Sequence, residues 1–191
     1  MELKILYVHG YGSRGSSTGK AIEKQVEQEF DAARMLYNHY YDEIISGRQI
    51  KEVIGRIEAD CREFAPHIVI GSSFGGFLAT LIPGCVRILV NPCLRPSDHI
   101  RSISPDMSEA DSEKLQAMEH AFSTRACDGL ATWGLFSLCD ELFGGSGYSE
   151  LYKSVYGTER LRMMDSPHRI SKAAIRDSLM PVIRLEAARL G

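Results

Sequence analysis

Short apolar runs recur along the chain, each bounded by polar or turn-forming residues and each about as long as a buried β-strand. Most of these runs are apolar throughout rather than alternating, which is typical of strands in a parallel sheet that is covered on both faces. The predicted strands cover residues 5–8, 33–37, 68–70, 86–90, 133–138 and 161–164.

The segments between these runs have helical periodicity. Apolar residues recur every three or four positions in residues 22–30 and 50–61, which predicts two amphipathic helices. Residues 77–82 are apolar nearly all round, as expected of a helix packed in the middle of a protein. A last helix is predicted around residues 175–183, where Pro181 should cause a kink or a break. Strands alternating with helices predict a three-layer α/β fold with a mostly parallel sheet.

One segment departs from this alternation. Residues 93–129 separate two predicted strands, and 37 residues are far more than the usual loop of about 2 to 6 between a strand and a helix. Ser104-Pro105 resembles a helix N-terminus, and a second helix is indicated by the apolar stripe Leu115, Met118 and Phe122. We therefore expect a single domain over residues 1–191, with residues 93–129 forming a cap-like insertion of one or two short helices over the sheet.

Composition and charge narrow the possible partners. The 191 residues include 22 Lys and Arg against 25 Asp and Glu, a formal net charge of −3, and the basic residues are scattered. Such a chain is not built to bind nucleic acid. No apolar stretch approaches the roughly 20 residues of a membrane span, so we expect no stable membrane association. The five cysteines are odd in number and form no C-x-x-C pair, which indicates a reducing compartment and predicts a cytoplasmic protein.

The strongest chemical motif is Gly71-Ser72-Ser73-Phe74-Gly75, a G-x-S-x-G pattern. Because this pattern also arises by chance, its context decides: an apolar strand precedes it and a predicted helix follows, as a nucleophile elbow requires. Ser73 lies at the apex, where a strained backbone would expose its hydroxyl, and Ser72 is the neighbour most easily confused with it. The alternative is a strand-to-helix turn without catalytic function.

A serine nucleophile needs a base, and the base needs an acid. His168 follows the last predicted strand and precedes the final helix, whereas the other candidates fit a surface or packing role: His39, His67, His99 and His120. Asp140 comes first after the strand at residues 133–138, and the order Ser73, Asp140, His168 is that of α/β hydrolases. Glu141 and Asp165 remain alternative acids.

The first predicted strand ends in a glycine-rich turn that could complete the site. The backbone amide of Tyr11 in this turn and that of Phe74 beside the nucleophile are the predicted oxyanion-hole donors. His9 should brace the turn rather than react. The stretch Gly15 to Lys20 superficially resembles a phosphate-binding loop, but it lacks the first glycine and the hydroxyl residue after Lys20.

These residues resemble one family in particular. Residues 5–12, the elbow at 71–76, Asp140-Glu141, His168 and above all the stretch Asn91-Pro92-Cys93-Leu94-Arg95-Pro96 are similar to the YqiA-type short esterases of the α/β-hydrolase superfamily. The resemblance extends over nearly the whole chain. It implies a compact single-domain hydrolase that acts on esters, with Ser73, Asp140 and His168 in the positions of the family's catalytic triad.

The sequence thus predicts a serine esterase with an α/β-hydrolase fold that forms an acyl-enzyme on Ser73. The expected partner is a small-molecule ester, and neither a metal nor an organic cofactor is needed. A non-catalytic ligand-binding or interaction module on the same fold and a thioesterase are the alternatives. The pattern carries no prediction of acyl-chain length, leaving group or oligomeric state.

Overall fold

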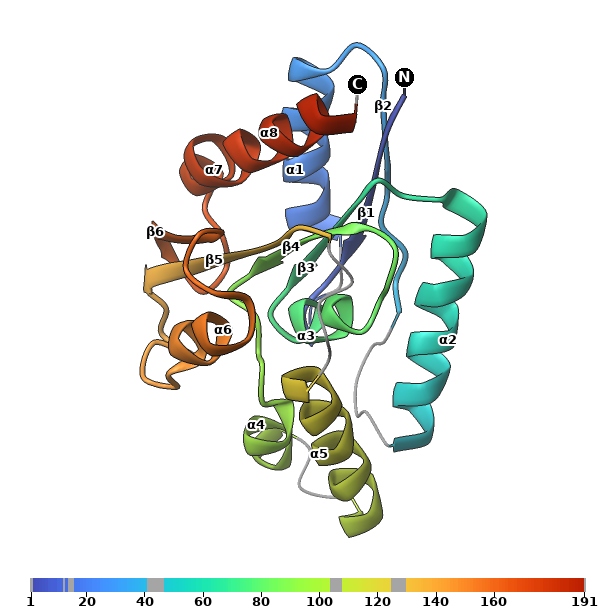
Figure 1. Cartoon of the computed structure of the whole chain (residues 1–191), viewed down its shortest axis with the longest axis vertical. Coiled ribbons are helices and arrows are strands. Elements are labelled where there is room, and N and C mark those ends of the chain that lie inside the picture. Colours follow the sequence, from blue (N-terminus) through green and yellow to red (C-terminus); the bar gives the residue numbers. More distant parts are fainter. Residues whose placement is uncertain are drawn as a thin grey trace.

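Six strands form one sheet in the order β2-β1-β3-β4-β5-β6, and every neighbouring pair is parallel (Figure 1). The computed structural model describes residues 2–11, 13, 16–40, 47–103, 108–124 and 130–190. The strands are β1 (Leu3–Val8), β2 (Ala33–Leu36), β3 (Ile68–Ser72), β4 (Val86–Val90), β5 (Thr132–Cys139) and β6 (Leu161–Pro167). All six predicted strands are therefore present, and the predicted α/β fold class is confirmed.

The helices alternate with the strands along the chain. They are α1 (Ser16–Glu29), α2 (Gly47–Phe64), α3 (Phe74–Thr80), α4 (Pro96–Ile103), α5 (Glu109–Thr124), α6 (Tyr148–Tyr156), the short α7 (Lys172–Ala174) and α8 (Met180–Leu190). Helix α6 was not predicted from the sequence. The pattern that would have indicated this helix is three tyrosines at intervals of four residues: Tyr148, Tyr152 and Tyr156. The first two of them are buried.

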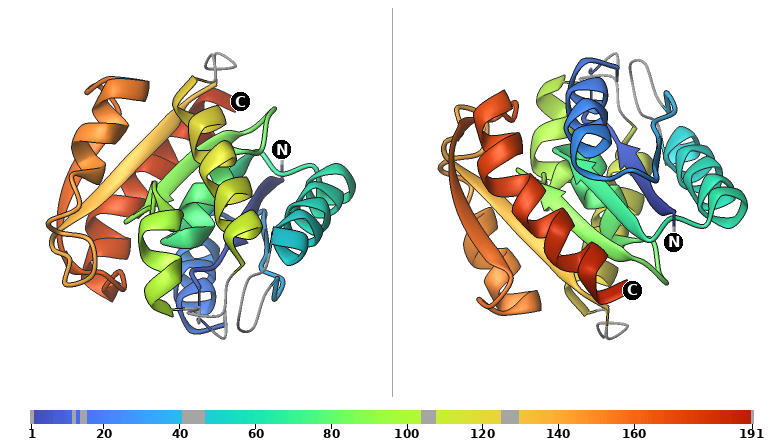
Figure 2. Two further views of the ribbon diagram at one scale, coloured as in Figure 1. Left: turned by 90° about the horizontal axis from the view of Figure 1, so that it is seen from below. Right: turned by 90° about the horizontal axis from the view of Figure 1, so that it is seen from above.

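The sheet separates two hydrophobic cores, because successive side chains of a strand point to opposite faces. In β1, Leu6 and Val8 face one core, which α2, α3, α5 and α6 complete, whereas Ile5 and Tyr7 face a second core under α1 and the C-terminal helices (Figure 2). Burying one large apolar side chain contributes about 1.5–3 kcal/mol, so both cores hold their helices firmly on the sheet.

The predicted irregularity at Pro181 is confirmed. Residues 175–179 form a π-helical turn, η1 (Ile175–Leu179), in which the amide of Met180 donates to the carbonyl of Ile175 five residues earlier. Proline has no amide hydrogen, and its ring would collide with the carbonyl four residues before it in a regular α-helix. The wider turn just ahead of Pro181 accommodates this mismatch while leaving α8 continuous beyond it.

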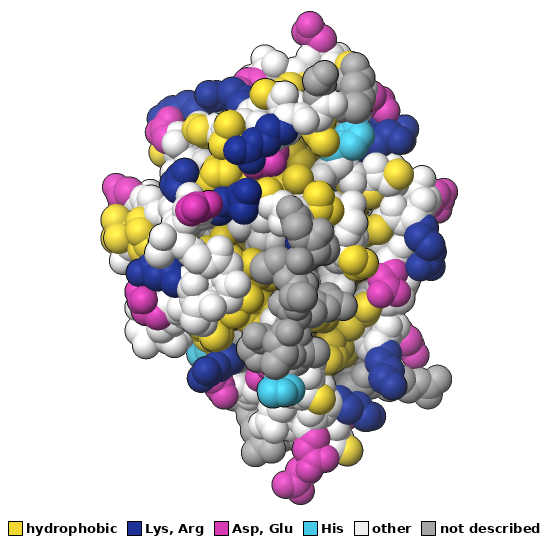
Figure 3. All heavy atoms as spheres, viewed as in Figure 1, with side chains coloured by type: hydrophobic (Ala, Val, Ile, Leu, Met, Phe, Trp, Pro, Cys, Tyr) yellow, Lys and Arg dark blue, Asp and Glu magenta, His cyan; other side chains and the backbone are white. Residues whose placement is uncertain are grey.

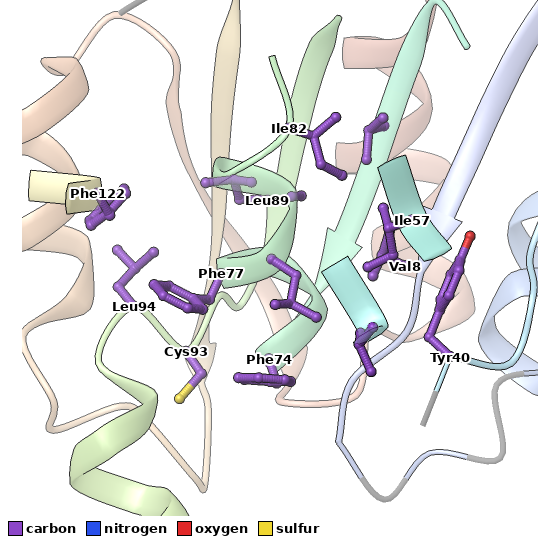
Figure 4. Close-up of a cluster of buried hydrophobic side chains, with 14 of the residues drawn as sticks. Val8, Tyr40, Ile57, Phe74, Phe77, Ile82, Leu89, Cys93, Leu94 and Phe122 are labelled. Carbon is purple, nitrogen blue, oxygen red and sulfur yellow. The ribbon is translucent and has the colours of Figure 1, made fainter. Parts of the chain in front are cut away.

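The insertion contains two helices, as predicted, but α5 is longer than expected with its 16 residues. Both helices lie beyond the carboxyl end of the sheet (Figures 1 and 2). Leu115 and Phe122 of α5 are buried in the same core as Phe77 of α3, and Figure 4 shows Leu94 between these helices. The predicted helix start at Ser104-Pro105 lies outside the described residues. The insertion is therefore anchored in the main core rather than lying loosely over it.

The surface carries mixed charge. Figure 3 shows basic and acidic side chains interspersed over one face, without a field of a single sign among its described residues. Within the described part of the chain, no helix combines the length and the apolar character needed to cross a membrane.

Candidate active site

Ser73 occupies the sharp turn between β3 and α3, with backbone angles φ 54° and ψ −122°. A non-glycine residue rarely adopts a positive φ, and such strain clusters at functional sites. The turn is possible only because glycines surround it. A Cβ on Gly71 would lie 2.7 Å from the Cα of Gly76, and a Cβ on Gly75 would collide with the backbone of Val8 at the end of β1. The sequence pattern thus predicted both the turn and its strain.

The backbone of Ser73 is held by the segment that follows β4. The amide of Ser73 donates to the carbonyl of Val90 at 2.9 Å, and the amide of Cys93 donates to the carbonyl of Ser73 at 3.0 Å. These two hydrogen bonds tie the elbow to the neighbouring strand on both sides of its Cα. The strained conformation is therefore stabilised by the fold around it.

His168 and Asp140 form a buried pair at the same end of the sheet. Nδ1 of His168 lies 2.9 Å from Oδ2 and 3.1 Å from Oδ1 of Asp140. The imidazole side chain is only 11% exposed and the carboxylate 6%. Because the carboxylate accepts a hydrogen bond from Nδ1–H, the second nitrogen, Nε2, is left as the basic one. Among the hydrogen bonds of the described residues none joins Ser73 to His168.

The loop after β5 fixes the carboxylate of Asp140. Its Oδ1 accepts the backbone amides of Leu142 at 2.9 Å and Phe143 at 2.8 Å. The ring of Phe143 stands edge-on to the imidazole of His168, with centroids 4.8 Å apart and planes at 88°. Both partners of the pair therefore have few orientations open to them.

The three candidate acids have different surroundings in the structure. Asp140 contacts the imidazole, whereas Glu141 accepts the backbone amide of His168 on Oε2 at 2.8 Å. This hydrogen bond is the main reason why the pKa of Glu141 is lowered from its ordinary value. Asp165 is exposed within β6, which extends to Pro167, three residues beyond the end of the predicted strand. The two consecutive acidic residues after β5 thus have different roles toward one histidine.

The turn after β1 lies against the elbow. A Cβ built on Gly10 would be 3.0 Å from Cβ and 3.6 Å from Oγ of Ser73. Tyr11 follows in this turn, which a hydrogen bond from the amide of Ser13 to the carbonyl of Gly10 closes at 3.2 Å. Phe74 directly follows Ser73 as the first residue of α3. The two residues predicted to supply oxyanion donors are therefore on the segments that flank the serine.

His9 braces the turn after β1, as the sequence indicated. It is buried, and its Nε2 accepts the backbone amide of Tyr40 at 3.1 Å. The proton therefore lies on Nδ1, which donates to the carbonyl of Gly10 at 2.9 Å. Both ring nitrogens are engaged in holding backbone, which leaves neither for proton transfer.

The remaining described histidines have other surroundings. His67 accepts the amide of Lys4 at the amino end of the sheet, far from the elbow, and His39 stacks on His9 at 5.0 Å. His99 of α4 contacts the ring of Phe143 with centroids 4.7 Å apart. The insertion therefore reaches the vicinity of His168 through Phe143, a contact that the sequence pattern did not indicate.

The described residues indicate neither a cysteine nucleophile nor a metal centre at this site. Cys93 is part of the buried hydrophobic cluster (Figure 4), and burial raises the pKa of its thiol to about 12. Such a thiol stays protonated and is a poor nucleophile. Across the residues that the structure describes, no group of three or more His, Cys, Asp or Glu side chains is arranged to hold a metal ion.

Asn91 is the polar residue whose role the sequence left unassigned, although its stretch was singled out. It is 2% exposed, and its side chain contacts Ser137 and the backbone carbonyl of His168. A buried asparagine directly after a strand, at the carboxyl edge of a parallel sheet, is the signal that could have identified it.

Comparison with solved structures shows which known proteins share this fold. Est1E from Butyrivibrio proteoclasticus matches with a TM-score of 0.70 at 12% identity, over 96% of this chain and 89% of that one. The esterase domain of a Rhodothermus marinus protein matches with a TM-score of 0.68 at 13% identity, over 98% and 87%. The Pyrococcus furiosus esterase Pf2001 gives 0.61 at 12%, over 98% and 81%. At such low identity these matches establish the fold alone, an α/β-hydrolase fold.

The family follows from the sequence itself. Residues 4–126, more than half of the chain, match the uncharacterised protein family UPF0227, and the chain belongs to that family. The resemblance to YqiA-type proteins is thereby confirmed. Comparison with curated protein sequences gives no match.

Proposed function

We propose that this protein is a serine hydrolase that cleaves carboxylic esters through an acyl-enzyme formed on Ser73. The observation that carries the proposal is the buried pair of Asp140 and His168, which stands at the same sheet edge as the strained serine. Nucleophile, base and acid are the three groups that acyl transfer requires. The esterases with the same fold add support for this reaction class.

In the proposed mechanism, Nε2 of His168 takes the proton of Ser73 as its oxygen attacks the ester carbonyl. Asp140 holds the imidazole in the Nδ1–H tautomer and stabilises the imidazolium that forms. The amides of Tyr11 and Phe74 bind the developing oxyanion. His168 then returns the proton to the leaving alcohol, and a water molecule, activated in the same way, releases the acid. The residues supply all of these steps without a metal or an organic cofactor.

The proposed substrate is a small ester, and the proposed location is the cytoplasm. Cys61, Cys85, Cys93 and Cys139 are free thiols, as a reducing compartment would keep them. We propose that residues 93–129 act as the cap-like part of a single domain and influence which acyl group is accepted, because His99 of the insertion contacts Phe143 beside His168.

A fluorophosphonate probe tests the proposal, because only an activated serine reacts with it. The wild-type protein should be labelled, and Ser73→Ala should not. A panel of 4-nitrophenyl esters from acetate to palmitate, run beside a thioester series, then identifies the acyl chain and the leaving group. Absence of both labelling and hydrolysis in the folded wild-type protein would indicate a non-catalytic binding module instead.

A further inference from the structure

The stretch Val90–Cys93, which joins β4 to the insertion, contacts both halves of the candidate site. Val90 and Cys93 bind the amide and the carbonyl of Ser73, at 2.9 and 3.0 Å. Asn91, between them, reaches in the other direction, toward the end of β6. Three residues of this stretch thus contact the backbone of the nucleophile or that of the base.

The side chain of Asn91 uses both its donor and its acceptor. Its Nδ2 donates to the carbonyl of His168 at 2.7 Å and to Oγ of Ser137 at 2.8 Å, and its Oδ1 accepts the amide of Ser137 at 2.7 Å. The backbone of Asn91 has φ 44°, a left-handed conformation that asparagine tolerates better than most residues. Its amide donates to the carbonyl of Leu135, which locks it to β5. The position therefore requires a short side chain with one amide donor and one acceptor.

From this geometry we propose that Asn91 is a positioning residue, which sets the place of His168 relative to Ser73. This inference rests on the proposed serine-hydrolase function. Ser73 follows β3 and His168 follows β6, two strands that β4 and β5 separate in the sheet, and among the hydrogen bonds of the described residues none joins the two. The hydrogen bond from Asn91 to the carbonyl of His168 connects the base directly to the segment that holds the nucleophile. Misplacement of a reacting group by about 1 Å can cost about 100-fold in rate, so this connection matters for proton transfer.

Two variants test the inference, each preserving a different part of the site. Asn91→Asp keeps the size of the side chain and the acceptor for Ser137, but it turns a carboxylate oxygen toward the carbonyl of His168. Asn91→Gly removes the side chain and tolerates the positive φ. The matched control is Thr132→Val, which removes a different buried polar group, the hydroxyl that accepts from Nε of Arg87 at the amino end of β5. Circular dichroism spectra matching that of the wild type select the variants that are folded.

Kinetics with 4-nitrophenyl acetate give the first measurement. We expect Asn91→Gly and Asn91→Asp to lower kcat by about 10- to 100-fold with KM changed less than about twofold. For Thr132→Val, both kcat and KM should stay within about twofold of the wild-type values. In a His168→Ala background, Asn91→Gly should cost nothing further, because Asn91 acts through the histidine. An equal loss in that background would place the effect of Asn91 elsewhere and overturn the inference.

Histidine-selective ¹⁵N NMR gives a second measurement that does not need activity. The Nδ1 and Nε2 resonances of His168, assigned with His168→Ala, should shift or broaden in both Asn91 variants and not in Thr132→Val. Unchanged resonances together with wild-type kcat in a folded Asn91 variant would refute the positioning role. If the wild-type protein neither hydrolyses esters nor reacts with a fluorophosphonate, the proposed function fails, and the NMR result still decides whether Asn91 orients His168.

Discussion

Both carboxylate oxygens of Asp140 lie within 3.1 Å of Nδ1 of His168, and one of them, Oδ1, also accepts two backbone amides. The amides of Leu142 and Phe143 can only donate, so the atom opposite them must be an acceptor. Oδ1 is therefore held by the amides, which leaves Oδ2 as the oxygen nearest to Nδ1 of His168. An acid in this position is held so that it accepts a hydrogen bond from Nδ1–H of His168.

The first prediction follows for Asp140→Asn. Its Oδ1 should face the two amides, which forces its NH₂ group toward Nδ1 of His168 and moves the imidazole proton to Nε2. We expect kcat to fall by up to about 10⁴-fold while the protein stays folded, as in a serine triad with the wrong tautomer. Steady-state ester hydrolysis measures the loss. Asp165→Asn, on the exposed side of β6, is the control and should remain within about twofold of the wild type. The reverse ranking would assign the acid to Asp165.

The second prediction separates the two adjacent serines. Ser73→Ala should lower kcat by at least about 10³-fold. Ser72→Ala should cost far less, because the Ser72 hydroxyl is hydrogen-bonded to the phenol of Tyr7 on the other face of the sheet. Ester hydrolysis and fluorophosphonate labelling of both variants provide the measurement. Wild-type rates in both would refute the elbow as the reactive site.

The third prediction concerns pH. The amide of His168 lowers the pKa of Glu141, so the folded state binds this proton less readily than the unfolded chain. The stability that this carboxylate adds is therefore present above its ordinary pKa near 4.5 and is lost as pH falls through the lower folded value. Glu141→Gln keeps an acceptor but does not titrate. The difference in unfolding free energy between the wild type and Glu141→Gln, measured in urea from pH 6 to pH 3, should thus shift in favour of the variant toward low pH. A difference that does not vary with pH would contradict the assigned hydrogen bond.

The fourth prediction uses two glycines with different surroundings. A methyl group on Gly10 would lie 3.0 Å from Cβ of Ser73, so Gly10→Ala should displace the serine by a few tenths of an ångström. We expect about a tenfold loss in kcat. Gly55→Ala, within α2, meets no atom within 4 Å and should instead stabilise the helix by up to about 1 kcal/mol with unchanged activity. Kinetics and urea unfolding of both variants test the contrast. A Gly10→Ala enzyme as active as Gly55→Ala would show that the turn after β1 does not press on Ser73.

The fifth prediction tests how the insertion is attached. Leu115 of α5 is completely buried in the core shared with α2 and α3. Leu115→Ala should therefore lower the free energy of unfolding by about 2–5 kcal/mol. The neighbouring exposed substitution Lys114→Ala should change it by less than about 0.5 kcal/mol. A chemical unfolding curve measures both. A loss below about 1 kcal/mol in Leu115→Ala would mean that α5 moves independently of the core.

The sequence by itself determined the alternation of strands and helices, because the apolar periodicity records which side of each element is buried. It also determined the elbow at Ser73, since only glycines permit so close an approach of a strand and a helix. Asp140 and His168 could be predicted because each directly follows a strand, and the carboxyl ends of parallel strands meet at one edge. Helix α6 was missed because its stripe consists of tyrosines rather than aliphatic residues.

Only the tertiary structure decided how the three strand ends meet. The choice among Asp140, Glu141 and Asp165 depends on side-chain direction and on the irregular pairing of β5 with β6 near Cys139, which local pattern does not encode. Asn91 and Phe143 contact His168, although they lie 77 and 25 positions before it in the chain. Such contacts form only when the folded sheet brings distant segments together, and no periodicity along the chain records which of its polar residues will then meet.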